Sequence, residues 1–169
     1  MTVLDTDRLV LRRLTPDDAP FIIGLVNEPS WLQYIGDRGV RTLDDARDYI
    51  VKGPVDSYER FGFGLYLVEL KPARVPIGIC GLLKRDALDH PDVGFAFLPG
   101  YWGQGYAWES ASAVLDYGTG ALGMRRVLAV TSPDNYRSIK LLEKMGFVFE
   151  RAIRLKEDGP ESKLFAIEA

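Results

Sequence analysis

The middle of the chain carries its most informative stretch, Pro99-Gly100-Tyr101-Trp102-Gly103-Gln104-Gly105-Tyr106-Ala107. It joins an alternating apolar segment, residues 92–98, to a helical apolar stripe over residues 105–122. The first turn of a helix offers backbone N–H groups without intrahelical partners, and glycine lets an anion approach them closely. The stretch therefore predicts a diphosphate-binding loop, with a merely tight turn as the alternative.

Two common nucleotide-binding patterns do not fit this stretch. A P-loop needs Gly-Lys followed by Ser or Thr, and that triplet is absent here. A dinucleotide fingerprint begun at Gly103 and Gly105 requires glycine at position 108, which is Trp108 in this chain. Such a fingerprint also follows the first strand of a βαβ unit, which is not where this stretch lies.

The segment before the loop predicts a strand with two unlike faces. Alternation separates three bulky residues from two small ones and an acid: Val93, Phe95 and Phe97 against Asp92, Gly94 and Ala96. A nearly bare face indicates that something other than side chains lies against this strand.

The spacing of apolar residues along the chain, together with the turn-forming residues between them, predicts the remaining helices and strands. Strands are expected at residues 8–14, 63–70, 77–83, 92–98, 126–131, 147–155 and 163–167. Helix-start signals lie at Thr15 and Thr42, where a hydroxyl residue precedes two acids, and at Pro133. Gly53 is the expected end of the second helix. The fold class is therefore α+β, a mixed α/β chain with two helices after the first strand.

Composition narrows the function classes. A length of 169 residues suits a single domain, residues 1–169, and a net charge of −3 argues against a nucleic-acid partner. The N-terminus is too charged for a signal peptide and no apolar run suits a membrane span, so a cytoplasmic protein without membrane contact is expected. With one cysteine, Cys80, and one histidine, His90, no disulfide and no metal site are expected.

The loop and the segments around it resemble those of a known family. The residues Trp102-Gly103-Gln104-Gly105-Tyr106-Ala107 are similar to the coenzyme A pyrophosphate loop of GNAT acetyltransferases, Gln/Arg-x-x-Gly-x-Gly/Ala. Gly105 and Ala107 match this pattern, whereas Trp102 stands at the Gln/Arg position. Because the loop works through backbone donors, that departure leaves the resemblance intact.

Two further segments extend the resemblance over nearly the whole chain. Asn135-x-x-Ser138-x-x-Leu141 with Gly146-Phe147 is similar to a segment of the branch that contains the ribosomal-protein alanine acetyltransferases. The opening Thr6-Asp7-Arg8-Leu9-Val10-Leu11-Arg12 resembles the first strand of that RimJ/RimL-like branch.

The resemblance implies a GNAT acyl-CoA acyltransferase fold, in which helices flank a mixed, mostly antiparallel sheet of about seven strands. It implies an acetyl-CoA-dependent N-acetyltransferase, with acetyl-CoA as co-substrate and no metal. The acceptor would be a primary amine, on a protein N-terminus or a small molecule. A homodimer is common among such relatives. A catalytically inactive CoA- or nucleotide-binding regulatory module is the alternative function.

The resemblance also names the coenzyme-binding residues. The loop would contribute Trp102, Gly103, Gln104, Gly105, Tyr106 and Ala107, and the later helix Asn135 and Ser138. Similarity places Ser138 near the coenzyme sulfur. The position at which many members of the family carry a Tyr as the thiol acid holds Leu142, which cannot donate a proton. The alternative for Asn135 and Ser138 is capping of the helix.

A base must remove a proton from the amine, because an amine is mostly protonated at neutral pH. Asp92 is the candidate, since Asp92-Val93-Gly94-Phe95 resembles a Glu-x-Gly-aromatic pattern of such enzymes. The alternative is a solvated acid at the start of a strand. His90 is a rival base. Glu109, near the helix start, is expected to serve structure rather than catalysis, and Cys80 to be a small buried residue.

Overall fold

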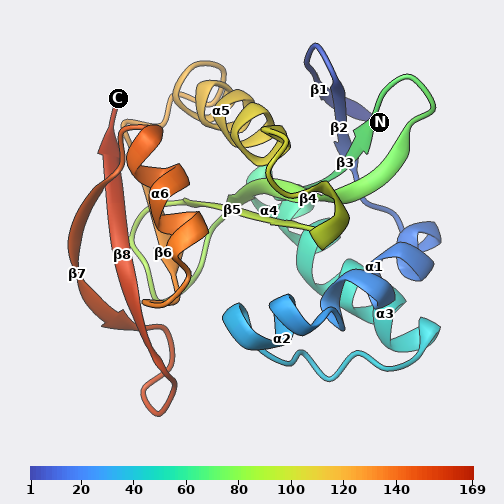
Figure 1. Cartoon of the computed structure of the whole chain (residues 1–169), viewed down its shortest axis with the longest axis horizontal. Coiled ribbons are helices and arrows are strands. Elements are labelled where there is room, and N and C mark those ends of the chain that lie inside the picture. Colours follow the sequence, from blue (N-terminus) through green and yellow to red (C-terminus); the bar gives the residue numbers. More distant parts are fainter.

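The computed structural model describes all residues, 1–169, and contains one eight-stranded sheet of order β1-β2-β3-β4-β5-β6-β8-β7. Neighbouring strands are antiparallel except β5 and β6, which are parallel (Figure 1). The strands are β1 Thr2–Asp5, β2 Leu9–Arg13, β3 Leu65–Leu70, β4 Val75–Leu83, β5 Asp92–Phe97, β6 Arg126–Thr131, β7 Val148–Arg154 and β8 Glu161–Glu168. The prediction of a mixed, mostly antiparallel sheet is confirmed.

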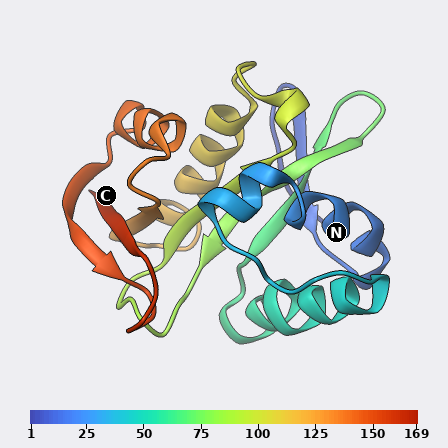
Figure 2. The ribbon, with the colours of Figure 1, turned by 60° about the horizontal axis from the view of Figure 1, so that its bottom comes forward.

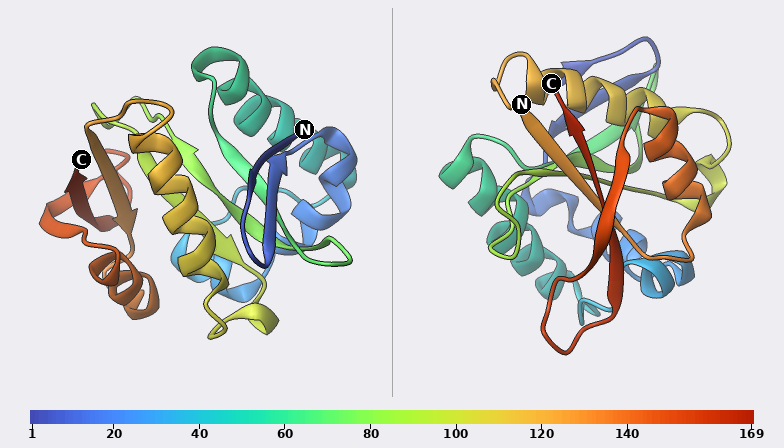
Figure 3. Two further views of the ribbon diagram at one scale, coloured as in Figure 1. Left: turned by 90° about the horizontal axis from the view of Figure 1, so that it is seen from above. Right: turned by 90° about the vertical axis from the view of Figure 1, so that its left-hand side faces the viewer.

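Helices cover both faces of the sheet. They are α1 Ala19–Val26, α2 Pro29–Tyr34, α3 Leu43–Ile50, α4 Asp56–Phe61, α5 Tyr106–Thr119 and α6 Tyr136–Lys144. Alternation along β3 shows the two layers, because Tyr66 and Val68 belong to the core beneath α5, whereas Leu67 belongs to the core beneath α1 and α3. Seen from above, α5 lies over the middle strands (Figure 3). No helix is long and apolar enough to cross a membrane.

Three elements differ from the sequence prediction. β1 is an eighth strand of four residues that pairs with β2, and α2 is an unpredicted helix of six. Gly53 does not end the second helix: the chain continues through a π-helical turn, Val51–Val55, into α4. The end lies at Gly62, whose φ of +79° is the left-handed conformation that glycine adopts without strain.

The predicted helix starts are confirmed. Thr15 and Thr42 both form capping boxes with the acid three residues later, Asp18 and Asp45. These caps satisfy backbone donors that a helix start leaves without partners. The sequence signals therefore place the α1 region and α3 correctly along the chain.

The sheet opens where β5 meets β6. Only two residue pairs, Asp92 with Leu128 and Val93 with Ala129, join these parallel strands before they diverge. On one side of this opening lie β1 to β5 with α1 and α3, and on the other the β7–β8 hairpin with α6 (Figure 2). The core beneath α5 draws residues from both sides, including Val93, Val127 and Phe165, and so holds them together.

Candidate active site

A cavity of about 610 Å³ lies where β5 and β6 diverge. Its volume falls within the range of small-molecule sites. Both strands, the loop before α5, and the helices α2 and α6 contribute to its wall. The lining includes residues 93–97 and 129–131 of the strands, Trp102, Gly103, residues 105–108, Asn135, Ser138, Leu142, Glu28, Trp31 and Tyr34.

The loop before α5 offers a run of unused backbone donors. The amides of Gly103, Gln104 and Gly105 make no hydrogen bond within the protein. Those of the first turn of α5, residues 106–108, have no intrahelical acceptor, and the first bond of the helix is Glu109 N to Gly105 O at 3.0 Å. Gly103 and Gly105 have φ of +74° and +84°, which side-chain-bearing residues rarely adopt. This arrangement suits an anion at the start of a 14-residue helix.

Trp102 anchors the loop to the end of β5. Its indole Nε1 donates to Phe97 O at 2.9 Å, and the guanidinium of Arg137 lies 5.1 Å above its ring. Trp102 therefore fixes the loop against β5 and contacts α6 through Arg137. It does so from the position at which the family pattern has Gln or Arg.

Gln104 is the one predicted coenzyme-binding residue that does not line the cavity. Its side chain is exposed, with Nε2 3.3 Å from Gly100 O, and its backbone carbonyl accepts from Arg8 at 3.0 Å. Gln104 therefore contributes to the site through its backbone, by its unused amide and by the conformation of the loop.

Asn135 and Ser138 both line the cavity, as the coenzyme-binding interpretation requires. Asn135 is also the N-cap of α6, because its Oδ1 accepts from the backbone N of Ser138 at 3.3 Å. The capping interpretation of Asn135 is thus confirmed, and the cap uses the backbone N of Ser138 rather than its hydroxyl. Leu142 lies in the same wall and is buried.

Asp92 lies outside the residues that line the cavity. Its carboxylate is buried, and both oxygens accept from Arg85 Nε, at 3.0 and 3.2 Å. Burial raises the pKa of Asp92, and this effect outweighs the opposing charge and hydrogen bonds of Arg85. It is not a solvated acid, and its contacts are those of a structural ion pair.

Other candidates from the sequence lie away from the cavity wall. His90 does not line it. Cys80 is fully buried, as expected, and burial raises the pKa of its thiol to about 12, so the reactive thiolate is suppressed. Glu109 binds Thr6 and Arg8, which confirms its structural role.

The bare face of β5 is covered in part by protein side chains, at Gly94. A Cβ at Gly94 would meet Leu83 Cδ1 at 3.1 Å and Leu65 Cδ2 at 3.7 Å. Gly94 and Ala96 of this face nevertheless line the cavity, so the expectation of a ligand lying against the face stays a prediction. Ligand space opens along the edge of β5, where β6 diverges and residues 93–97 all reach the cavity.

The wall formed by α2 carries groups that the sequence did not single out as a set. Glu28, Trp31 and Tyr34 line the cavity on this side, and the Glu28 carboxylate makes no hydrogen bond or ion pair within the protein. On the opposite wall lie three cations, Arg137, Lys140 and Lys144. Nothing in the hydrophobic periodicity of the sequence indicates that α2 lies beside this site. The tertiary fold alone brings them together.

Comparison with known proteins agrees with this geometry. Residues 8–148 match the family model described as acetyltransferase (GNAT) domain. The uncharacterized N-acetyltransferase YoaA of Bacillus subtilis is 32% identical over 154 residues, 90% of this chain and 86% of YoaA. YkkB of the same organism is 30% identical over 156 residues, 90% of this chain and 89% of YkkB.

Solved structures share the fold. An acetyltransferase from Agrobacterium tumefaciens superposes with a TM-score of 0.84 at 24% identity, covering 100% of this chain and 95% of its own. The ribosomal-protein acetyltransferase RimL, in complex with coenzyme A, gives a TM-score of 0.83 at 18% identity, covering 99% of this chain and 98% of RimL. At these identities the likeness concerns the arrangement of the chain.

Proposed function

The chain belongs to the GNAT acetyltransferase family, and on that basis we propose that it transfers an acetyl group from acetyl-CoA directly to a primary amine. The observation that carries the proposal is the run of unused amides from Gly103 to Trp108 at the edge of the cavity. Backbone donors at a helix start fit a diphosphate, and coenzyme A contains one.

The charge distribution of the cavity supports an anionic coenzyme on the side of α6. Arg137, Lys140 and Lys144 line that wall, next to Asn135 and Ser138. Cationic side chains favour phosphate groups, and lining groups of one sign raise the local concentration of the opposite sign. We assign Ser138 to the departing thiolate, because its hydroxyl is a donor on this wall whereas Leu142 has none.

The reaction forms a bond between the amine nitrogen and the acetyl carbon while the carbon–sulfur bond breaks. A bound ammonium loses one proton before its nitrogen attacks and a second as the amide forms, while the departing thiolate takes up one, so one proton is released overall. The sequence predicts Asp92 as the base, but its buried contact with Arg85 favours a structural role instead. Glu28 is a carboxylate on the cavity wall itself and is the better-placed proton acceptor or ammonium-binding group.

The wall formed by α2 supports a cationic acceptor. Glu28 is unpaired, and the rings of Trp31 and Tyr34 line the same region. Aromatic faces and a carboxylate together bind an ammonium group. Both a protein N-terminus and a small-molecule amine carry this group. A single domain over residues 1–169, a cytoplasmic location and a homodimer remain predictions.

The test measures coenzyme binding and turnover separately. Calorimetric titration with acetyl-CoA should show saturable binding, and thiol release should follow when primary amines are added. The panel contains peptides with free N-termini, a polyamine, amino-acid amides and an aminoglycoside, each with its N-blocked form as the matched control. Product mass should rise by one acetyl group only for the free amines.

The variant Glu28→Gln should raise the KM for the amine several-fold and leave the Kd for acetyl-CoA unchanged, because an ammonium loses its counter-charge. Tight binding of acetyl-CoA without turnover on any amine would establish the inactive binding module instead. Absence of acetyl-CoA binding would overturn the proposal altogether.

A further inference from the structure

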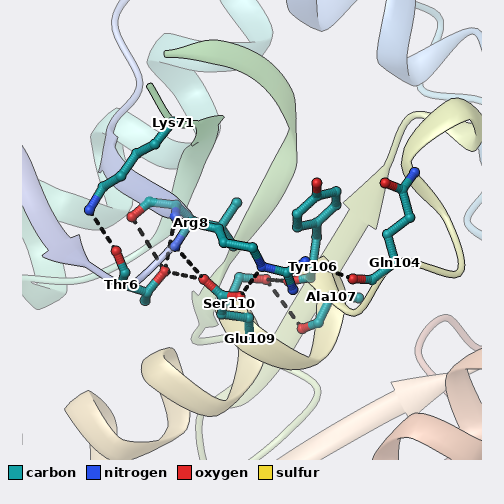
Figure 4. A network of polar contacts seen from close by, with 9 residues as sticks. Thr6, Arg8, Lys71, Gln104, Tyr106, Ala107, Glu109 and Ser110 are labelled. Carbon is teal, nitrogen blue, oxygen red and sulfur yellow. Dashed lines mark hydrogen bonds and ion pairs between the residues drawn. The ribbon is translucent and has the colours of Figure 1, made fainter. Parts of the chain in front are cut away.

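Arg8 reaches from the turn between β1 and β2 to the start of α5 (Figure 4). Its Nη1 donates to Gln104 O at 3.0 Å, a residue 96 positions further along the chain, and its Nε donates to Glu109 Oε1 at 2.7 Å. The guanidinium carbon lies 4.4 Å above the Tyr106 ring. A Cβ added at Gly105 would be 3.2 Å from Arg8 Nη2. The Arg8 side chain thus contacts the end of the loop and the first turn of α5.

Glu109 completes the contact from the helix side. Its Oε2 accepts from Thr6 Oγ1 at 2.6 Å and from Arg8 N at 3.0 Å, while Oε1 takes Arg8 Nε. Burial alone would raise the pKa of Glu109, but the hydrogen bonds from Thr6 and Arg8 outweigh it and hold the pKa below its usual range. The carboxylate is therefore ionised at neutral pH.

An ionised Glu109 without Arg8 would oppose coenzyme binding. It lies one turn inside α5, close to the amides that would receive a diphosphate, and two negative charges repel each other. The Arg8 guanidinium neutralises that charge on the face of the helix that does not line the cavity, since neither Arg8 nor Glu109 belongs to its wall. The helix start is then left with its positive end toward a ligand.

Arg8 also sets the direction of one peptide unit. A trans peptide is planar, so its C=O and the following N–H point in opposite directions. Because Arg8 holds the carbonyl of Gln104, the N–H of Gly105 is directed away from Arg8. Gly105 lines the cavity and its amide is unused within the protein, so this orientation presents a donor to the site.

We propose that Arg8 is a positioning residue for the phosphate-binding loop. It acts from outside the cavity, by orienting the Gln104–Gly105 peptide and by neutralising Glu109, and so sets the affinity for the diphosphate of the coenzyme. The proposal rests on the proposed function, in which residues 103–108 receive that diphosphate.

The test compares two acetyl donors on the variant Arg8→Gln. Kd for coenzyme A should rise about tenfold, the effect of losing hydrogen bonds between charged groups. The kcat at saturating acetyl-CoA and amine should stay within about twofold, because the loss affects ground state and transition state alike. With S-acetylpantetheine, which lacks the diphosphate, kcat/KM should not change. A general loosening of the fold would weaken both donors equally.

Two further variants separate the two actions of Arg8. Arg8→Lys keeps the charge but not the planar fork that reaches Glu109 and Gln104 together, so it should lose part of the affinity. Arg8→Gln combined with Glu109→Gln should regain part of what Arg8→Gln loses, because the uncompensated carboxylate is gone. Arg126→Gln is the matched control, since Arg126 pairs with Glu150 and Glu168 at the far end of β6.

The outcomes are distinct. Unchanged coenzyme A affinity in Arg8→Gln would overturn the positioning role, while wild-type binding would still support the proposed function. Equal losses for both acetyl donors, or an equal loss in Arg126→Gln, would also overturn it. A wild-type protein that does not bind coenzyme A would remove both proposals. Arg8 is partly exposed, with 44% of its side-chain surface accessible, so the variants should fold, and their melting temperatures check this.

Discussion

Asp92 begins β5 with a carboxylate whose side chain is 1% exposed and whose two oxygens both accept from Arg85. Its residue type and its place in the sequence suggest a base, but neither reveals that Arg85 already occupies it. A base must reach the proton it removes, directly or through one water. At the scale of the residue, the burial of Asp92 and its contact with Arg85 are therefore stronger evidence about its role than the sequence motif is.

The variant Asp92→Asn should keep kcat within about threefold of wild type, whereas loss of a general base costs about a hundredfold to ten-thousandfold. Because the folded pKa of Asp92 is raised, its contribution to stability is fully present below the unfolded pKa. That contribution is lost as pH rises through the folded pKa. Denaturant unfolding of both proteins from acid to neutral pH should show the variant gaining relative to wild type. A collapse of kcat, with the acid limb of its pH profile gone, would restore Asp92 as the base.

At the scale of elements, the segment from α3 to α4 contains two glycines, Gly53 and Gly62. Glycine is a common helix-ending residue, but only one of the two ends a helix here. Gly53 lies inside the π-helical turn, whereas Gly62 ends α4 with φ of +79°. Apart from chain neighbours and nearby helix backbone, a Cβ at either position would meet no atom within 4 Å. Tertiary packing therefore does not distinguish them; backbone conformation does, together with Pro54, which directly follows Gly53.

Gly62→Ala should lower the free energy of unfolding by about 1–2 kcal/mol, because a side chain disfavours the left-handed conformation. Gly53→Ala should change it by less than about 0.5 kcal/mol, because the helix preference of alanine is offset by the contact of its Cβ with Cδ of Pro54. The two variants are matched controls for each other in urea denaturation. A loss of the same size at Gly53 would contradict the continuous helical path from α3 to α4.

At the scale of the whole molecule, the site exists because the sheet opens. Two residue pairs join β5 to β6, and beyond them both strands contribute to the cavity wall. α5 covers the opening from one face and α6 flanks it (Figure 1). A ligand seated there contacts both sides and should hold them together.

Hydrogen exchange should report this coupling. Coenzyme A at about a hundred times its Kd should slow exchange by up to about a hundredfold for amides that open only in the free protein. Slowing is expected in residues 93–97, 103–108 and 129–131 together, with the β1–β2 pair as the unaffected reference. Slowing confined to residues 103–108 would show that the coenzyme binds the loop without bridging the strands.

Local signals predicted much of this protein from its residues. The capping boxes at Thr15 and Thr42, the glycine-rich helix start and the Asn135 cap depend on neighbours within a few positions, so they are visible in the sequence. The short elements β1 and α2 were missed, because four to six residues carry too little periodicity to stand out.

The sequence alone determined a mixed α/β chain, and it predicted an anion-binding helix start and a coenzyme-binding helix after it. The opening between β5 and β6, the Arg85 partner of Asp92, the Glu28 side of the cavity and the Arg8 contact with Glu109 emerged only from the folded molecule. Arg8 and Glu109 are 101 positions apart, and no local propensity or period links residues at that distance. Such pairings depend on how layers pack around the sheet, so they follow from tertiary structure.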